Sequence, residues 1–307
     1  MGGVLEGFAI IGVVILIGYL VGRIGILGPH APFVLSRIVF FVLSPCLLFT
    51  VLAEASVRTL FSSVLLISLM TALVAFAAYA VVAKLAWKRP IPELVVGALG
   101  SGYVNANNIG IPVAVYVLGN AAVSAPVVLL QLLLFAPVAL TILDISTSGS
   151  VSVGRILLQP VRNPLIIASL LGVILSVTGV RLPPVVMEPF TIVGGAAVPV
   201  VLMSFGMSLH GQRLLQPGSG RRDVLLASAI KLSLMPVMAW IFGAFLFHLD
   251  PKHLLSVVVL AGLPSAQNVF NYAQRYERGV TIARDTVLIT TIGAVPVLVL
   301  VAALLAR

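Results

Sequence analysis

The chain has 307 residues, of which 60% are hydrophobic and only 9% charged, and its mean hydropathy is +1.20. This composition excludes a water-soluble domain and predicts an integral membrane protein of many helices. The single cysteine, Cys46, excludes a disulfide framework and a thiolate metal site. The net charge of +9 comes from bases in short loops between apolar runs, which is a pattern of membrane topology and not of a nucleic-acid-binding face.

Ten apolar segments, each of about 20 residues, are expected to cross the lipid bilayer as helices. Turn-forming pairs such as Gly28-Pro29 and Pro183-Pro184 separate them. Their length and the lack of strict alternation exclude a β-barrel. The segments cover residues 4–22, 33–53, 60–83, 94–118, 124–143, 163–180, 190–209, 224–247, 253–274 and 286–305.

The basic residues predict an orientation for these helices. If the ten helices alternate in direction, thirteen of the eighteen Lys and Arg residues lie on the side of the loops after helices 1, 3, 5, 7 and 9. The opposite side, which includes both chain ends, has four. Because positively charged loops stay in the cytoplasm, both termini are predicted to lie outside, in a multi-pass protein of the cell membrane.

The fourth segment places three amides and a proline where a simple span carries Leu or Val. It contains the sequence Asn105-Ala-Asn-Asn-Ile-Gly-Ile-Pro112. Pro112 lacks a backbone donor and clashes with the carbonyl one turn back, so the helix is expected to break just ahead of it, at Gly110. Broken backbone at membrane depth is tolerated only inside protein or beside a polar cavity, so this stretch is predicted to line a solute site.

The ninth segment has a similar interruption at Pro264, followed by Ser265, Gln267 and Asn268. Pro264 lies 152 positions after Pro112, and Pro199 lies 154 positions after Pro45, which indicates a duplication. Because each half has an odd number of helices, the two halves must be inverted relative to each other. The predicted organisation is a first five-helix repeat over residues 1–143, a cytoplasmic linker over 144–162 and a second five-helix repeat over 163–307.

Inverted repeats bring the two breaks close together, so the half-helices that follow them direct their positive dipole ends at one place. Such a site favours an anion, typically a carboxylate. The amides at the breaks either bind this solute or merely satisfy backbone groups that the breaks leave free. The predicted substrate-binding amides are Asn105, Asn108, Gln267 and Asn268.

Lys231 is the only ionisable residue well inside a predicted span. Three interpretations are open for its ammonium group. It faces the cavity and attracts the anion, it anchors a loosened carbonyl, or it extends along its four-carbon stem to the basic side of the membrane. We include Lys231 among the predicted substrate-binding residues.

Other kinds of chemistry find little support in the sequence. All acidic residues lie at or near span ends, so a cation exchanger would lack its central carboxylate. The group of His248, Asp250 and His253 on one outer loop is more typical of a solvated turn than of a metal site. No Ser-His-Asp arrangement and no Walker-type phosphate loop is evident, so no enzymatic activity, ATP-driven mechanism, cofactor or metal is predicted.

Three stretches resemble the auxin efflux carrier family, particularly its bacterial malate and malonate permease-like members: 105–112, 229–236 and 263–276. The resemblance covers essentially the whole chain. It implies ten transmembrane helices, with a scaffold domain of helices 1, 2, 6 and 7 that forms a homodimer. It also implies a transport domain of helices 3–5 and 8–10, in which the broken helices 4 and 9 cross. In that family an organic-anion site is surrounded by the residues that correspond to Asn105, Pro112 and Pro264.

The sequence therefore predicts a secondary transporter of a small organic anion, such as a mono- or dicarboxylate, that works by alternating access through an elevator-like or rocking movement. The expected partners are the anion, the lipid bilayer and a second copy of the chain, with no nucleic acid. Two alternatives stay open: a sodium-coupled organic-anion symporter of the bile-acid type, and a membrane sensor that binds an anion without moving it.

Overall fold

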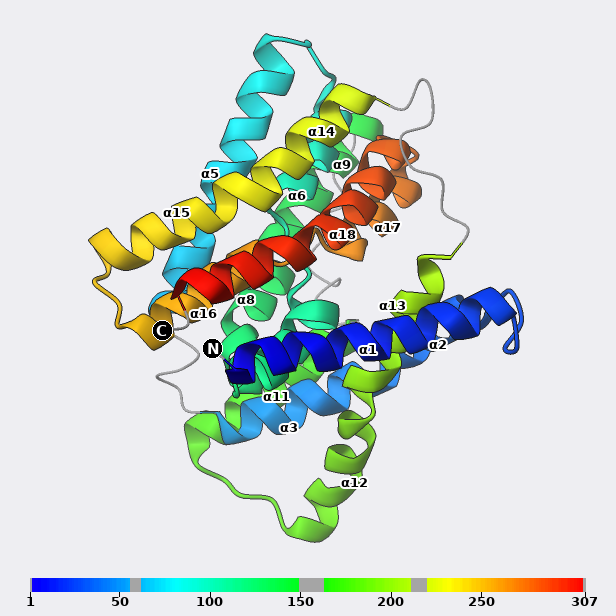
Figure 1. Cartoon of the computed structure of the whole chain (residues 1–307), viewed down its shortest axis with the longest axis vertical. Helices are drawn as coiled ribbons and strands as arrows, with labels where there is room; N and C mark the ends of the chain where they lie inside the picture. Colours follow the sequence, from blue (N-terminus) through cyan, green and yellow to red (C-terminus); the bar gives the residue numbers. More distant parts are fainter. Residues whose placement is uncertain (1, 56–61, 149–162, 211–219, 306–307) are drawn as a thin grey trace.

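A computed structural model describes residues 2–55, 62–148, 163–210 and 220–305 (Figure 1). Over these residues all regular elements are helices, and the one β-type pairing is an isolated bridge between Val104 and Ser265. The predicted all-helical class is therefore confirmed. Most of the predicted linker, residues 149–162, lies outside the described residues.

The first half of the chain contains helices that correspond to the first five predicted segments. These are α1 (Gly2–Ile24), α2 (Ala31–Ile38), η1 (Val39–Leu43), α3 (Ser44–Glu54), α5 (Ser63–Leu85), α6 (Ile91–Gly102), η2 (Ala106–Gly110), α7 (Ile111–Tyr116), η3 (Ala121–Ser124), α8 (Ala125–Leu130), η4 (Gln131–Phe135) and α9 (Ala136–Ser148).

The second half follows in the same manner. Its helices are α11 (Pro164–Thr178), α12 (Pro184–Gly195), α13 (Ala197–Ser208), α14 (Arg221–Ala229), η5 (Ile230–Leu234), α15 (Met235–Ile241), η6 (Phe242–Leu246), α16 (Pro251–Gly262), α17 (Gln267–Tyr276) and α18 (Val280–Leu305).

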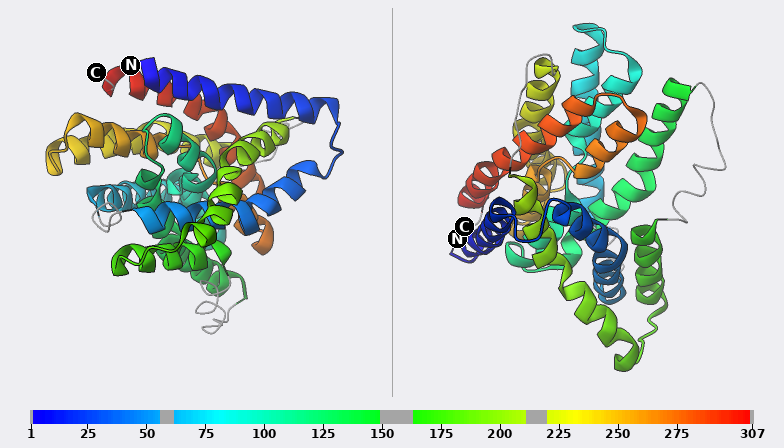
Figure 2. Two further views of the ribbon diagram at one scale, coloured as in Figure 1. Left: turned by 90° about the horizontal axis from the view of Figure 1, so that it is seen from below. Right: turned by 90° about the vertical axis from the view of Figure 1, so that its right-hand side faces the viewer.

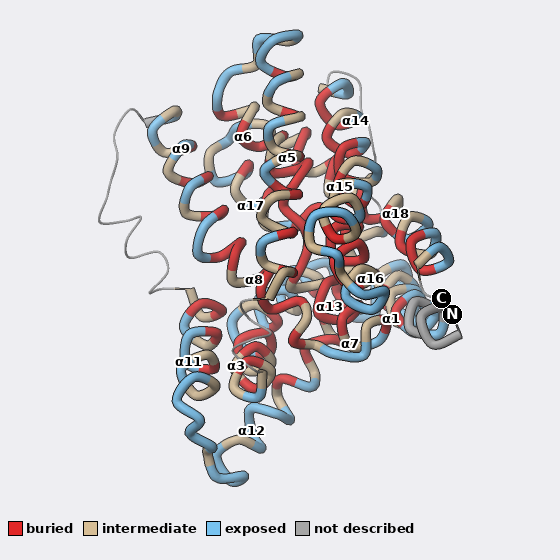
Figure 3. The backbone as a smooth tube through the Cα atoms, turned by 90° about the vertical axis from the view of Figure 1, so that its left-hand side faces the viewer, coloured by how far each residue is buried: buried red, intermediate tan, exposed pale blue. Residues whose placement is uncertain are grey.

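Six continuous helices of the described chain are long and apolar enough to cross a membrane: Ala31–Glu54, Ser63–Leu85, Ala121–Thr147, Pro184–Ser208, Arg221–Leu246 and Val280–Leu305. Four shorter apolar helices accompany them: Ala9–Ile24, Ile91–Gly102, Pro164–Thr178 and Pro251–Gly262. Buried residues gather at the centre of the molecule, while the outer helices are exposed (Figure 3). Large aliphatic side chains such as Leu171 and Ile192 are among these exposed residues, as expected of a surface that faces lipid.

Wide π-helical turns occur where prolines follow within apparently continuous helices. The turns η1, η2, η4 and η5 each end two residues before a proline, at Pro45, Pro112, Pro137 and Pro236 respectively. A proline within an α-helix clashes with the carbonyl four residues earlier and cannot donate to it. In the wide turns the preceding backbone N–H groups bond five residues back, as from Ser44 to Val39, so the helix continues past the proline.

The helices pack in two groups. The elements α1, α2, α3, α11, α12 and α13 pack mainly on one another and occupy the lower half of Figure 1. The elements α5, α6, α9, α14, α15, α16, α17 and α18 pack on one another and occupy most of the upper half. The two groups meet where α1 contacts α18, and the segment after the first interruption contacts the first group through α7 on α1 and η2 on α13.

The two ends of the described chain, at the start of α1 and the end of α18, lie side by side in both views of Figure 2, and the two helices are in contact. This arrangement is compatible with an even number of membrane crossings, which brings both ends to the same side of the membrane.

A buried acid joins three elements of the upper group. Asp223, in the first turn of α14, is fully buried and accepts hydrogen bonds from the Tyr79 hydroxyl at 2.9 Å and from the Arg89 Nε at 3.0 Å. The Arg89 guanidinium also forms an ion pair with the second carboxylate oxygen. Hydrogen bonding to Asp223 raises the pKa of Arg89 above its usual value, so the guanidinium group stays charged at any physiological pH. This network fixes the start of α14 to α5 and to the turn before α6.

Glycines allow α1 and α13 to approach each other closely. A β-carbon on Gly18 would lie 2.2 Å from the backbone oxygen of Met203, and one on Gly206 would lie 2.0 Å from the backbone oxygen of Ile15. The two backbones therefore touch, which is a common way for helices to associate in lipid. Gly12, on the same helix α1, has open space at the corresponding position.

Substituting Gly18→Ala is expected to lower the free energy of unfolding by about 1–3 kcal/mol, because the added methyl group must displace the α13 backbone. Gly12→Ala is the matched control and is expected to leave stability unchanged or slightly raised, since it places the same methyl group in open space. Thermal unfolding of the purified protein in one detergent measures both effects. Equal stability of the two variants would contradict the close packing of α1 on α13.

Candidate functional site

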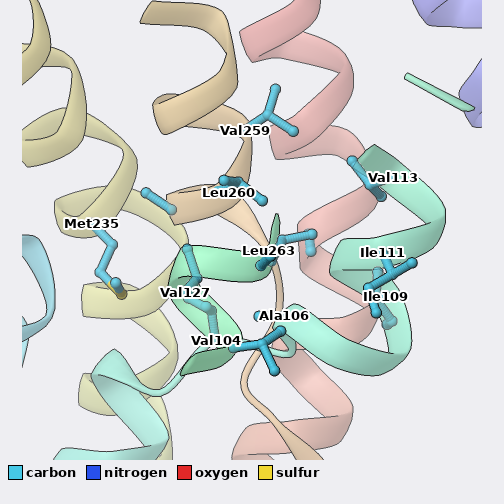
Figure 4. Packing of buried hydrophobic residues seen from close by; sticks show 14 of the residues in the cluster. Val104, Ala106, Ile109, Ile111, Val113, Val127, Met235, Val259, Leu260 and Leu263 are labelled. Carbon is cyan, nitrogen blue, oxygen red and sulfur yellow. The ribbon is translucent and has the colours of Figure 1, made fainter. Parts of the chain in front are cut away.

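Two interruptions of the helices cross each other in the middle of the molecule. The first separates α6 from η2, and the second separates α16 from α17. The Asn105 N–H donates to the Pro264 carbonyl at 2.8 Å, and the Ala266 N–H donates to the Tyr103 carbonyl at 2.9 Å. The two extended segments are thus paired in antiparallel fashion, with Val104 opposite Ser265. Figure 4 shows the apolar side chains that pack here, including Val104, Ala106 and Leu263.

The second interruption follows from the chemistry of Pro264. Proline has no N–H for the Leu260 carbonyl, so the helical ladder ends there. In a continuous helix the Ser265 N–H would donate to the Ala261 carbonyl, but here it donates to Thr290 Oγ1 of α18 at 3.1 Å. The Ala261 carbonyl instead accepts a hydrogen bond from Lys231 Nζ at 2.6 Å.

Side chains also satisfy the backbone groups that the first interruption leaves without helical hydrogen bonds. Gln131 Nε2 donates to the Val104 carbonyl and Ser124 Oγ donates to the Ala106 carbonyl, each at 2.8 Å. The Ser265 hydroxyl donates to the Gly100 carbonyl. The Asn105 Oδ1 accepts from the Asn108 N–H at 3.1 Å and caps the helix that follows. Buried backbone at this crossing is therefore satisfied by protein groups.

The first interruption does not lie where the sequence predicted it. The helix breaks at residues 103–105, whereas Gly110 and Pro112 lie beyond the break, in the continuous η2–α7 helix. The wide turn η2 accommodates Pro112, so this proline needs no break directly ahead of it. Gly110 instead allows close packing, because a β-carbon there would lie 2.9 Å from the Leu263 side chain.

A cavity of about 560 Å³ lies beside the crossing. One part of the lining comes from α2, η1, α11 and α13, and the other part comes from the first interruption, η2, η4 and α17. The cavity is thus formed between the two helix groups. Its polar lining residues are Ser36, Arg37, Asn105, Asn107, Asn108, Gln131, Ser204, Ser208, Gln267, Asn268, Asn271 and Gln274.

The four amides predicted to bind substrate, Asn105, Asn108, Gln267 and Asn268, all line this one cavity. Asn105 is among the more deeply buried, with 6% of its surface exposed. Its Oδ1 serves as a helix cap, while no hydrogen bond to a described residue occupies its Nδ2. The two predicted roles of the amides, backbone satisfaction and contact with a solute, are therefore compatible within one side chain.

The electrostatic character of the cavity favours negative charge. No Asp or Glu occurs among the described residues that line it. The helix α17 begins at Gln267 in the cavity wall, and no side chain caps its first N–H groups. Uncapped N–H groups and the positive end of the helix dipole attract anions.

Lys231 is placed differently from the cation expected in the cavity. Its side chain is fully buried and does not line the cavity. The ammonium group donates to the Ala261 carbonyl at 2.6 Å and lies 3.2 Å from the Met235 sulfur. Of the three interpretations, the structure favours the one in which the ammonium group donates to a backbone carbonyl. Pro264 leaves the carbonyls at the end of α16 without helical N–H donors, and the Ala261 carbonyl is one of them.

Gln131 is a cavity residue that the sequence analysis missed. It is 5% exposed, supports the Val104 carbonyl and lines the cavity. The signal was a single glutamine within the apolar run 124–143, where an amide at membrane depth is costly without partners. Ser36 and Ser204, whose hydroxyl oxygens lie 3.1 Å apart, were missed because serine is common in helices of membrane proteins.

Comparison with protein families gives a match over residues 4–302 to a family described as "Membrane transport protein". The chain belongs to this family. A relative from Methanothermobacter thermautotrophicus, described as an uncharacterized transporter, is 28% identical over 289 residues, which is 91% of each chain. The auxin efflux carrier resemblance of the two break motifs is thereby confirmed at the level of the family. The protein is a multi-pass membrane protein of a transporter family.

Lys231→Met is expected to loosen the second interruption, because the Ala261 carbonyl loses its donor and an unsatisfied buried carbonyl costs about 1–3 kcal/mol. Backbone amides of residues 260–266 should then exchange hydrogen faster, by roughly tenfold or more. Lys252→Met changes an exposed lysine at the start of the same helix α16 and should leave this exchange unchanged. Exchange as slow as in the wild type would rule out the anchoring role of Lys231.

Proposed function

We propose that the protein is a secondary transporter of a small organic anion, such as malate, malonate or a related weak acid, that works by alternating access. The observation that carries this proposal is the cavity between the two helix groups, lined by amides from both helix interruptions and by no carboxylate. Membership of a membrane transport family supports the same conclusion.

The architecture that we propose is ten membrane-spanning helices in two inverted five-helix repeats. Three observations support it. Each half of the described chain contains an apolar helix that is interrupted at the fourth of its five helical segments, and the two interruptions pair in antiparallel fashion. Four helices shorter than a full span accompany the six long ones. The chain ends lie side by side, and the excess of basic residues on the opposite side favours an outward location of both termini in the cell membrane.

Binding of an anion is supported by the donors that the cavity offers. The Asn105 Nδ2, the amides of Gln267 and Asn271 and the uncapped start of α17 are all donors without a negatively charged neighbour in the lining. A carboxylate accepts several such hydrogen bonds at once. A cavity of about 560 Å³ has room for a small carboxylate together with water.

Alternating access follows in this proposal from the origin of the two cavity walls. The scaffold comprises α1, α2, α3, α11, α12 and α13, and it also forms the homodimer; the remaining helices form the transport domain. Movement of the transport domain against the scaffold carries the amide wall with its anion, because both interruptions belong to the moving domain. The crossing itself moves as one unit, because backbone hydrogen bonds join its two segments.

Asn105→Ala is expected to abolish carboxylate flux into proteoliposomes, measured with labelled malate and malonate. Since alanine also removes the helix cap, Asn105→Asp is the sharper variant: aspartate keeps a capping oxygen but replaces the amide donor by negative charge, so flux should also be lost. Asn120→Ala removes another capping amide, one that does not line the cavity, and should retain flux. An active Asn105→Asp variant would restrict Asn105 to the role of a helix cap.

Purified wild-type protein is expected to be stabilised by the carboxylate that it transports. At a hundredfold excess over Kd, binding to the folded state adds about 3 kcal/mol to the free energy of unfolding. Thermal unfolding with malate and malonate, each with sodium or potassium as the counter-ion, measures this effect. Stabilisation and uptake that require sodium would instead support the sodium-coupled symporter, and stabilisation without counterflow would support the sensor.

A further inference from the structure

Arg37 is the one charged side chain among the described residues that line the cavity. It lies in the second turn of α2, in the helix group that does not carry the amides of the two interruptions. No hydrogen bond or ion pair to another described residue involves its guanidinium group. An arginine without a carboxylate partner, in a cavity without acidic residues, leaves its positive charge available to a solute.

Two aromatic rings hold the guanidinium group of Arg37. Its Cζ atom lies 5.6 Å from the ring centroid of Phe33 and 5.1 Å from that of Phe41. The spacing of four residues on either side places both rings on the helix face that carries the arginine. Rings at these distances attract the cation through their faces and use none of its N–H groups. The five N–H donors thus stay available in the fork geometry that matches a carboxylate.

The position of Arg37 along the cavity is also informative. It lies in the second turn of the continuous helix Ala31–Glu54, which begins with α2, and the other lining residues Ser208 and Gln274 lie near the ends of α13 and α17. These three helix ends adjoin the loops that follow α1, α13 and α17, which are loops of the basic side. By the charge rule this is the cytoplasmic side of the membrane.

We propose that Arg37 binds the carboxylate group of the transported anion when the cavity faces the cytoplasm. This inference rests on the proposed function and adds a residue on the scaffold wall to the amides on the moving wall. Because Arg37 and the amides belong to different helix groups, movement of one group against the other separates the anion from Arg37. The arginine therefore raises affinity on the cytoplasmic side only, and the substrate must carry a carboxylate.

The test measures the KM for malate and malonate in proteoliposomes, separately for the cytoplasmic and external faces of the protein. Arg37→Gln is expected to raise the cytoplasmic KM by roughly 10–100-fold, as for the loss of a hydrogen-bonded charge, and to leave the external KM within about twofold. Arg37→Lys keeps the charge but loses the fork, so a severalfold increase is expected. Arg23→Gln, an exposed arginine of α1 outside the cavity, is the matched control and should behave as the wild type.

The outcomes separate this inference from the proposed function. If the wild type transports a carboxylate and Asn105→Asp does not, an unchanged cytoplasmic KM in both Arg37 variants overturns the role of Arg37 alone. An equal increase on both faces overturns its restriction to one side. If the wild type neither transports nor binds a carboxylate, the proposed function itself is overturned. Should Arg37→Gln not fold, as judged by thermal unfolding, Arg37→Lys decides by the same criterion.

Discussion

A helix that is interrupted within a membrane leaves backbone carbonyl and N–H groups that lipid cannot satisfy, and the centre of this protein is organised by that constraint. Each interruption supplies hydrogen-bond partners for the other through the pairing of Val104 with Ser265. Further groups come from neighbouring helices: Ser124, Gln131 and Lys231 donate to carbonyls, and Thr290 accepts from a backbone N–H. An interruption of one helix alone would lack the backbone partners that the other interruption supplies at Pro264 and Tyr103.

The same hydrogen bonds determine what is free to bind a solute. Carbonyl groups at the crossing are largely occupied by side-chain donors, whereas donors at the start of α17 and on Asn105 have no described partner. The cavity therefore presents donors that protein groups leave open. Carbonyl groups at the crossing need donors, so the side chains that support them, Gln131 and Lys231, bring no negative charge to it. The residues that stabilise the backbone are therefore compatible with the proposed anion.

Much of the fold could be predicted from the sequence because its strongest signals are local. Runs of aliphatic residues mark the helices within a few positions, and Pro264 marks the second interruption, since proline acts on its own turn. The first interruption was misplaced because Pro112 can be accommodated by a wide turn, a choice that depends on packing around the helix. The clustering of Asn105, Asn108, Gln267 and Asn268 was predictable from the expected symmetry.

Other features depend on distant contacts that the sequence does not display. The role of Lys231 is set by Ala261, thirty residues away, and the burial of Asp223 by Tyr79 and Arg89. Counting charges assigns Arg37 to the loop after the first helix, whereas α2 begins at Ala31 and carries the arginine in its second turn. Its place in the cavity becomes evident only when α2, α13 and α17 are brought together.

The wide turns ahead of the prolines have a consequence for every argument from helical periodicity in this chain. Each such turn holds about one residue more than an α-helical turn, so the helix beyond it is rotated by roughly 100° about its axis. Residues on the two sides of η1, η2, η4 or η5 that would share a stripe on a regular helix therefore point to different neighbours. At each of the four prolines, the helix beyond the wide turn therefore presents a different face to the protein than a regular helix would.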